Sequence, residues 1–305
     1  VLFGCCGWVF GVFWLVAIIS RRISTAQTLI GEIVIPFRNF MPSMPAILLY
    51  IIGGIIALSI LLYFAQDRFI FKPERLPADF KFQYDTPFEE LFFDIEPGVR
   101  INGLHFYVKD PFGLILYFHG NSRSIKGWAK YAKDFYRYQY DVVLVDYRGF
   151  GKSTGRRSEA KMLGDMQFVY TRLAERFPEN HILVYGRSLG SGFAARIASD
   201  NRPRYLLLDA PFYNFQKVVE RFLPILPVRY ILRYRLRTNK WIKRVNCHTY
   251  IIHGTKDWLI PIRHSEELQR LNPHKITLIR IPGGGHNNLP SFPEYHNFIR
   301  DILKY

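Results

Sequence analysis

A serine with the surroundings of a nucleophile lies at the centre of the pentapeptide GRSLG (186–190). The pentapeptide directly follows an apolar run and precedes a helix-like segment, which is the context that the pattern G-x-S-x-G needs for a strand–turn–helix. Gly186 and Gly190 leave room for a sharp turn, in which larger side chains would collide with the strand or the helix. We predict a strained turn that presents the Ser188 hydroxyl above a sheet edge, with the Leu189 N–H beside it as a donor to an oxyanion.

A base and an acid are needed as well, because a lone serine hydroxyl is a weak nucleophile. His286 follows the last apolar run, ITLIRI, after three glycines that allow a close-approaching turn. Asp257 lies in a loop after the preceding apolar run, TYIIHG. Serine, aspartate and histidine then occur in the chain order that accompanies this kind of turn. We predict Ser188 as the nucleophile, His286 as the general base and Asp257 as the acid that orients the base.

A second aspartate, Asp209, is an alternative partner for the histidine. It ends its own apolar run, YLLLD, and could reach His286 from there. We prefer Asp257, because it lies on the loop immediately before the one that carries the histidine.

An oxyanion also needs a second N–H donor, from the turn after an earlier strand. The apolar run LILYFH (114–119) leads into Gly120 and Asn121. Gly120 would let the backbone come close, so we predict the Asn121 N–H as the partner of the Leu189 N–H. An ordinary strand-to-helix turn is the alternative interpretation of these residues.

The elements that must position these residues are short apolar runs that alternate with helix-like stretches. Runs rich in β-branched and aromatic residues suit strands buried on both faces of a parallel sheet. They cover 114–119, 141–147, 182–186, 205–210, 249–254 and 276–281, after a first strand pair at 91–95 and 101–108. Helices are predicted at 124–137, 157–177, 189–200, 262–271 and 292–304. This alternation predicts the α/β class, with a mostly parallel, doubly wound sheet and right-handed crossovers.

The glycine-rich loop DYRGFGKSTG (146–155) looks like a nucleotide site but has the wrong spacing. It misses the dinucleotide fingerprint by one residue, and it lacks the spacing of a phosphate-binding loop. We expect it to line the face that carries Ser188, with supporting roles at best for Asp146 and Arg148. The chain has no H-E-x-x-H motif and only three cysteines, none in a C-x-x-C pair, so we predict no metal and no cofactor.

An uncharged segment of 21 residues, 44–64, is long enough to cross a membrane. A hydrocarbon core of about 30 Å needs about 20 apolar residues, and a buried core helix rarely stays apolar all round for so long. We therefore predict a transmembrane anchor at 44–64. A second uncharged run, 1–20, is either a further span or an apolar segment without that role, so one or two transmembrane helices precede the α/β domain.

These features divide the chain into an apolar N-terminal segment and linker (1–43), the anchor (44–64) and an α/β domain (65–305). The orientation in the membrane depends on the number of spans. With two spans, the basic loop between them favours a domain outside the cytoplasm. With one span, the basic residues that follow residue 65 favour the opposite side.

The formal net charge is +16, and half of this excess lies in one insertion, about residues 211–246. Lysine and arginine residues there are interleaved with large apolar side chains, and Glu220 is the single acid. A basic and apolar cap next to a membrane anchor suits contact with anionic headgroups. A cap helix that simply packs over the site is the alternative. Nucleic-acid binding is not expected, because no recognition motif accompanies the charge.

Five motifs, in order at predicted strand ends, resemble the serine-hydrolase branch of the α/β-hydrolase superfamily. They are HGNS (119–122), DYRGFGKSTG (146–155), YGRSLGSG (185–192), IIHGTKDWLIP (251–261) and GGGHNNL (283–289). Within that superfamily, residues 65–305 look like the membrane-anchored, bud-emergence-protein-like hydrolases, which are related to the serine aminopeptidase group. The resemblance implies the α/β-hydrolase fold, with a nucleophile elbow and a short helical cap.

The resemblance also implies the roles of Ser188 as nucleophile, His286 as base and Asp257 as acid, with Asn121 and Leu189 as the oxyanion donors. We predict hydrolysis of an ester or thioester through an acyl-serine, with a small-molecule or lipid-like substrate and the membrane as a partner. A serine aminopeptidase of the same fold is the nearest alternative, since the same residues would cleave a peptide bond. A non-catalytic membrane scaffold is a further alternative, which the intact set of residues disfavours.

Overall fold

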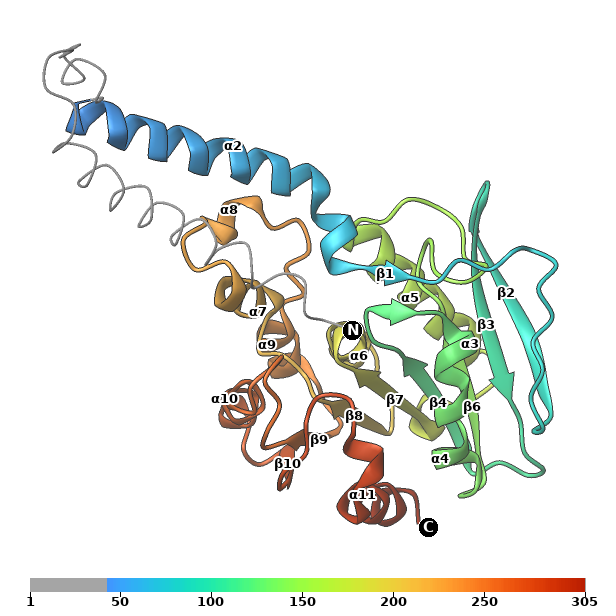
Figure 1. The fold of residues 1–305 in the computed structure, drawn as a ribbon. Coiled ribbons are helices and arrows are strands. Elements are labelled where there is room, and N and C mark those ends of the chain that lie inside the picture. Colours follow the sequence, from blue (N-terminus) through green and yellow to red (C-terminus); the bar gives the residue numbers. More distant parts are fainter. Residues whose placement is uncertain (1–42, 305) are drawn as a thin grey trace, which may run out of the picture. The chain divides into compact units, whose positions relative to one another are not determined.

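The computed structural model describes residues 43–304, and an eight-stranded sheet organises most of them (Figure 1). The strand order is β10-β9-β8-β7-β4-β6-β3-β2. Within this sheet neighbouring strands run parallel except at β3, which is antiparallel to both β6 and β2. The strands are β2 (Phe88–Glu96), β3 (Val99–Phe106), β4 (Gly113–Phe118), β6 (Tyr140–Val145), β7 (Ile182–Arg187), β8 (Tyr205–Asp209), β9 (His248–Gly254) and β10 (Ile276–Ile281). The prediction of a mostly parallel α/β sheet is confirmed.

Both faces of the sheet are buried, as the uninterrupted apolar runs predict. Alternate residues of β4 belong to different hydrophobic clusters: Leu116 and Phe118 to one, Ile115 and Tyr117 to the other. The four longest helices after β6 contribute side chains to these clusters, three to the first and one to the second. These helices are α5 (Glu159–Ala174), α6 (Leu189–Asp200) and α10 (Arg263–Leu271) in the first cluster, and α11 (Pro293–Leu303) in the second.

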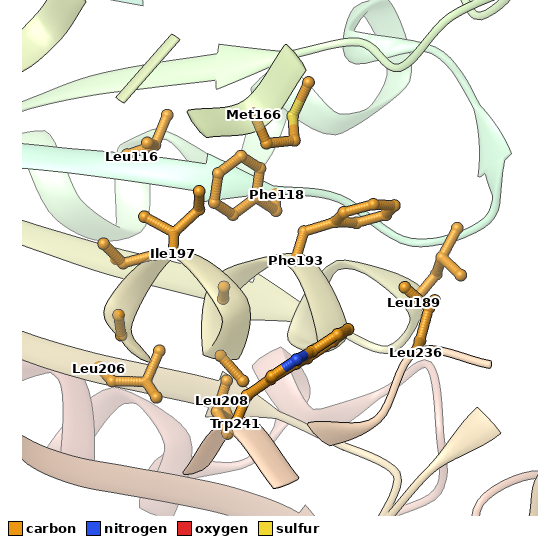
Figure 2. Packing of buried hydrophobic residues seen from close by; sticks show 14 of the residues in the cluster. Leu116, Phe118, Met166, Leu189, Phe193, Ile197, Leu206, Leu208, Leu236 and Trp241 are labelled. Atoms are coloured by element: carbon orange, nitrogen blue, oxygen red, sulfur yellow. The ribbon is translucent and has the colours of Figure 1, made fainter. Parts of the chain in front are cut away.

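Helix α6 is held firmly, because large apolar side chains surround it (Figure 2). Its residues Phe193 and Ile197 lie beside Phe118 and Leu116 of β4, and Trp241 approaches the helix from the opposite side. All five side chains are buried. Burying one such side chain contributes about 1.5–3 kcal/mol, so the helix that begins directly after Ser188 has little freedom to shift.

The sequence predicts one helix over 124–137, but three short helices replace it. They are α3 (Ile125–Trp128), η3 (Ala129–Tyr131) and α4 (Lys133–Tyr136). The Gly127 N–H donates to the Ser124 carbonyl at 2.9 Å, which is the i to i+3 bond of a tighter turn. Glycine is a poor helix former, and this one gives room to a side chain, since a Cβ at position 127 would lie 3.2 Å from Cδ of Arg123.

Helix α2 (Met44–Ile70) contains the predicted anchor and continues past its expected end at residue 64. The chain divides into two compact units, Val1–Ile56 and Ala57–Tyr305, and the boundary falls within this helix. By length and composition α2 could cross a membrane. The possible first span, 1–20, and the linker up to residue 42 lie outside the described residues.

Within the second unit, the last part of α2 changes from exposed to buried. The side chains of Leu61 and Phe64 are 62% and 73% exposed, unlike those of a core helix, whereas Ile70 and Phe71 are buried in the core. A short parallel pair follows, between β1 (Lys72–Pro73) and β5 (Ser122–Arg123). The residues directly after α2 are therefore joined to the turn that follows β4.

Three short α-helices, followed by the 3-10 helix η5 (Ile242–Arg244), lie between β8 and β9, where the sequence has its basic insertion (Figure 1). They are α7 (Phe215–Phe222), α8 (Val228–Ile231) and α9 (Thr238–Trp241). Gln66 of α2 connects to α8 and the residues after it, because its amide nitrogen donates to the Ile231 carbonyl at 3.0 Å and its amide oxygen accepts from the Arg233 N–H at 2.8 Å. The cap is thus tied to the end of the apolar helix as well as to the sheet.

Acid should weaken the contact between the cap and α10, where a histidine is buried in its neutral form. The His264 ring accepts a hydrogen bond at Nδ1 from the Tyr213 N–H, at 3.1 Å, and burial lowers the pKa of His264 to about 4. Between about pH 6.5 and pH 4, His264 binds a proton in the unfolded chain but stays neutral in the folded chain. We expect this histidine to remove about 2 kcal/mol from the free energy of unfolding as the pH falls from about 6.5 to about 4.

The measurement is the denaturation midpoint of the wild type and of His264→Asn at about pH 7 and about pH 4.5. Asparagine offers a carbonyl oxygen to the same N–H but does not titrate. The variant should therefore lose less stability than the wild type on acidification. An equal loss in both proteins would contradict the role given to His264.

Candidate functional site

The structure brings Ser188, His286 and Asp257 into one hydrogen-bonded row, here called the candidate triad. Nε2 of His286 lies 3.0 Å from Oγ of Ser188, and Nδ1 of His286 lies 2.7 Å from Oδ2 of Asp257. The other carboxylate oxygen of Asp257 accepts from the N–H groups of Leu259 and Ile260, at 3.0 and 2.8 Å. Because Nδ1 faces a carboxylate, the proton of a neutral His286 resides there, and Nε2 presents its lone pair to the serine.

Ser188 lies on a strained turn between β7 and α6. Its φ of 51° and ψ of −115° lie in a region that residues with a side chain seldom occupy. The two flanking glycines allow this turn by close approach. A Cβ at Gly186 would lie 2.5 Å from the Cβ of Ala194, and one at Gly190 would collide with the Phe118 carbonyl. The turn therefore has the geometry that the G-x-S-x-G pattern predicts.

The charge of Asp257 is favoured by its hydrogen bonds. Burial alone would raise its pKa, but hydrogen bonds from His253 and His286 outweigh burial and hold the pKa below the usual range. Nε2 of His253 lies 3.2 Å from Oδ2 of Asp257 and 2.8 Å from the Ile260 carbonyl, and Nδ1 lies 2.6 Å from Oγ of Ser265. The sequence analysis missed His253, although its position four residues before Asp257 in the same strand-end motif was a signal.

Asp209, the alternative acid, is engaged elsewhere. Its carboxylate is fully buried, and it accepts from the Tyr185 hydroxyl at 2.8 Å and lies 3.5 Å from Nε of Arg187. Among the described residues the hydrogen-bond partner of His286 Nδ1 is Asp257. Arg187, the residue before the candidate nucleophile, is thereby held by a buried ion pair that the sequence analysis did not anticipate.

The predicted oxyanion donors, Asn121 and Leu189, lie on the turns after β4 and β7. Neither backbone N–H donates to an acceptor within residues 43–304, as expected at the start of a helix for Leu189. The neighbouring Gly120 is close to the serine, since a Cβ there would lie 3.9 Å from the Cβ of Ser188. The Asn121 side chain donates to the Ile70 carbonyl at 2.9 Å, and its own carbonyl accepts from the Lys72 N–H at 2.9 Å.

Residues of the loop 146–155 form hydrogen bonds to the residues that flank the turn after β4. Asp146 is fully buried, and its Oδ1 lies 3.1 Å from Nε2 of His119 and 3.0 Å from the Ile125 N–H. Arg148 forms a two-pronged ion pair with Asp165, with contacts of 2.6 and 2.7 Å. Both residues fix the backbone around the sheet end and make no hydrogen bond to the candidate triad in the described chain.

A cavity of about 290 Å³ opens beside the candidate triad. Its lining includes the sequence neighbours of three predicted site residues: Ser122 after Asn121, Arg187 before Ser188, and Asn287 after His286. The rest of the lining comes from β5 and from α3 and η3, namely Arg123, Gly127, Trp128, Lys130 and Tyr131. Arginine and lysine are the charged groups of this lining. Over residues 43–304, no group of three or more histidine, cysteine or acidic side chains is arranged to hold a metal ion.

Comparison with known proteins gives a family match over part of the chain. The family described as serine aminopeptidase, S33, matches residues 109–242, which include Ser188 and the predicted oxyanion donors. The lysophosphatidylserine lipase ABHD12 of Danio rerio is 27% identical over 221 residues, covering 63% of this chain and 58% of that protein. The protein YfhR of Escherichia coli O157:H7 is 28% identical over 221 residues, covering 68% of this chain and 76% of that protein.

A solved structure shows the same fold. The esterase Pf2001 of Pyrococcus furiosus has a TM-score of 0.60 at 18% identity, covering 77% of this chain and 96% of the esterase chain. At this identity the similarity concerns the fold, whereas the sequence relatives carry the relationship to hydrolases. The strand order, the turn at Ser188 and these similarities agree with one another. The chain therefore has the α/β-hydrolase fold and is similar in sequence to proteins of that superfamily.

Proposed function

We propose that the protein is a serine hydrolase that cleaves an ester or thioester through an acyl-serine intermediate. The observation that carries this proposal is the hydrogen-bonded row from Asp257 through His286 to Ser188, with contacts of 2.7 and 3.0 Å. A base within hydrogen-bond reach of the hydroxyl, itself oriented by a carboxylate, is the arrangement that activates a serine.

In the acylation step, Oγ of Ser188 attacks the carbonyl carbon of the substrate while Nε2 of His286 takes the hydroxyl proton. The carbonyl oxygen becomes an oxyanion, and the N–H groups of Asn121 and Leu189 stabilise it. The bond to the leaving group then breaks, and His286 returns the proton to the departing alcohol or thiol. Asp257 keeps the imidazole oriented and stabilises its positive charge throughout.

In the deacylation step, water attacks the acyl group on Ser188 and gives its proton to Nε2 of His286. The second oxyanion uses the same two N–H donors. When the acyl–oxygen bond breaks, the carboxylic acid leaves and Ser188 recovers its proton from His286. No cofactor takes part in either step.

A peptidase of the same fold is the second candidate function, and the match to the serine aminopeptidase family favours it. An enzyme that selects a free peptide N-terminus needs a negatively charged group to bind the ammonium. The cavity beside the candidate triad has the opposite character, because Arg123, Lys130 and Arg187 line it without a carboxylate. This lining supports the ester and thioester proposal over the peptidase.

Helix α2 and the cap support a location at a membrane. Phe222, Ile225 and Tyr230 of the cap are exposed, Ile225 to 79%, and an arginine directly precedes both Phe222 and Tyr230 in the sequence. A surface that mixes exposed apolar and basic side chains suits the headgroup region of an anionic bilayer. The lipase among the relatives is consistent with a lipid-like substrate, which such a position would make accessible.

The test is a substrate panel on the full chain in detergent micelles, combined with labelling by a fluorophosphonate, which reacts with activated serines. The panel contains matched p-nitrophenyl esters of short and long acyl chains, a thioester, and an aminoacyl anilide with a free N-terminus. We expect turnover of the esters and the thioester together with labelling of Ser188. Cleavage of the anilide alone would favour the peptidase, and a folded protein without labelling or turnover would overturn the hydrolase mechanism.

A further inference from the structure

We propose that the cavity beside the candidate triad binds a phosphate group carried by the acylated substrate. This inference rests on the proposed hydrolase function and names its substrate class, acyl esters of phosphorylated alcohols. The cavity is placed for this task, since its lining includes the neighbours in sequence of Ser188, His286 and Asn121. Its link to the candidate triad in space is Arg187, whose Nη2 lies 3.4 Å from the His286 carbonyl oxygen.

The innermost cation of the cavity is Arg187. Its side chain is 3% exposed, and its guanidinium stacks over Trp128 and Tyr131, with its central carbon 5.4 and 5.1 Å from the ring centres. Nη2 points toward the His286 carbonyl at 3.4 Å. Burial opposes the charge, but Asp209 and the surrounding tyrosine hydroxyls together outweigh burial and raise the pKa of Arg187. Arg187 is therefore a fixed positive group beside the candidate triad.

The outer cations are Arg123 and Lys130, and Glu74 is the acidic residue that attracts Arg123. Neither forms an ion pair within residues 43–304, and the nearby Glu74 is paired with Lys126 at 3.1 Å. Lys130 Nζ lies 5.0 Å from the centre of the Tyr131 ring, and the Arg123 side chain runs over Gly127, which has no side chain to displace it. Both side chains are held at the cavity by contacts that leave their N–H groups available to a ligand.

The positive charge of the lining is complementary to the negative charge of a phosphate monoester. Asp209 balances Arg187, and Arg123 and Lys130 add positive charge at the outer rim, of which Glu74, shared with Lys126, offsets a part. A phosphate monoester carries about −1.5 to −2 at neutral pH and accepts hydrogen bonds at three oxygens. Arginine, lysine, the Ser122 hydroxyl and the Asn287 amide can all donate to it.

The first experiment measures binding to the full chain in neutral detergent micelles. The probes are glycerol 3-phosphate, inorganic phosphate and uncharged glycerol, titrated by calorimetry at constant ionic strength, because a net charge of +16 attracts any anion weakly. We expect both phosphates to bind and glycerol not to bind. The double variant Arg123→Gln/Lys130→Gln should lose at least about tenfold in affinity for the phosphates.

Lys133→Gln is the matched control, since Lys133 is an exposed lysine close in sequence that does not line the cavity. It removes one positive charge where the double variant removes two, so it measures the effect of surface charge per unit charge. Its affinity for glycerol 3-phosphate should stay within about twofold of the wild type. Equal affinities in the wild type, the double variant and the control would overturn the proposal, as would the absence of any phosphate binding.

A second experiment identifies the source of the phosphate and separates this inference from the hydrolase proposal. Full-chain Ser188→Ala is titrated with micelles that contain 1-acyl-glycerol 3-phosphate or the uncharged 1-acyl-glycerol. Tighter binding of the acylated phosphate than of glycerol 3-phosphate would identify a lipid headgroup, and equal binding would identify a water-soluble phosphate ester. Either result supports a phosphate site.

The wild type is then assayed for hydrolysis of the same two lipids. We expect the phosphorylated ester to have the higher kcat/KM, and the double variant should reduce this preference at least about tenfold. Phosphate binding without labelling or ester turnover would overturn the hydrolase mechanism but would still support the phosphate site. Labelling and ester turnover, without phosphate binding and without a preference for the phosphorylated ester, would overturn the phosphate site and support the hydrolase mechanism.

Discussion

Ser188→Ala should lower kcat for ester hydrolysis by about 10⁶-fold and abolish fluorophosphonate labelling. The reason is that the covalent route disappears when Oγ is removed, while the oxyanion donors and the rest of the site remain. The residual rate should stand about 10³–10⁴ above the reaction in water, because those groups still stabilise the oxyanion. The measurement is a single-turnover assay with a p-nitrophenyl ester, beside gel detection of the label.

The control is Ser199→Ala on the same helix, α6. Oγ of Ser199 donates to the Arg196 carbonyl at 2.7 Å, so this variant also loses one hydroxyl without touching the turn. It should keep its rate within about twofold of the wild type. Persistent labelling of Ser188→Ala would show that another serine is the nucleophile.

Asp257→Asn should reduce kcat by about 10⁴-fold, the second largest effect. An asparagine at this position offers an amide that can face His286 with either end, so the imidazole loses its fixed tautomer and the stabilisation of its positive charge. A cooperative denaturation transition should show that the Asp257→Asn variant is folded. The rate should be measured over a range of pH, because the loss of the carboxylate also removes support for the protonated imidazole.

Asp209→Asn distinguishes the two aspartates that the sequence offers. Asp209 partners Tyr185 and Arg187, and its loss leaves a buried guanidinium without its counter-charge. We expect this variant to lose about 3–5 kcal/mol of stability while its kcat stays far above that of Asp257→Asn. The reverse ranking of kcat would mean that Asp209, not Asp257, supports the base.

The fold was predictable because each strand of the parallel sheet is marked by its own continuous apolar run. The neighbourhood of Ser188 was also predictable, since the local context of GRSLG prescribes a strand, a turn and a helix. The order of Asp257 and His286 along the chain suggested their meeting, and in the structure they are 2.7 Å apart. The division of 124–137 into three pieces was not predicted, because tertiary contacts of Gly127 and its neighbours override the local helical pattern.

Contacts between distant segments account for what the sequence did not indicate. His253 looked like an ordinary strand residue, and only the folded loop brings its ring to Asp257. Arg187 lies in a variable position of G-x-S-x-G, and its burial depends on Asp209 and on two rings from η3 and α3. The partners of Arg187 are separated from it by tens of residues, so no periodicity of the chain records them.

The pairing of β1 with β5 couples the end of α2 to the turn after β4. The Asn121 amide donates to Ile70, the last residue of α2, and the Lys72 N–H donates back to the Asn121 carbonyl. With α2 embedded in a bilayer as proposed, a change in bilayer thickness tilts or shifts that helix. Its displacement would then act on the turn that carries the proposed oxyanion donor, so we expect the proposed hydrolysis to depend on the thickness of the surrounding bilayer.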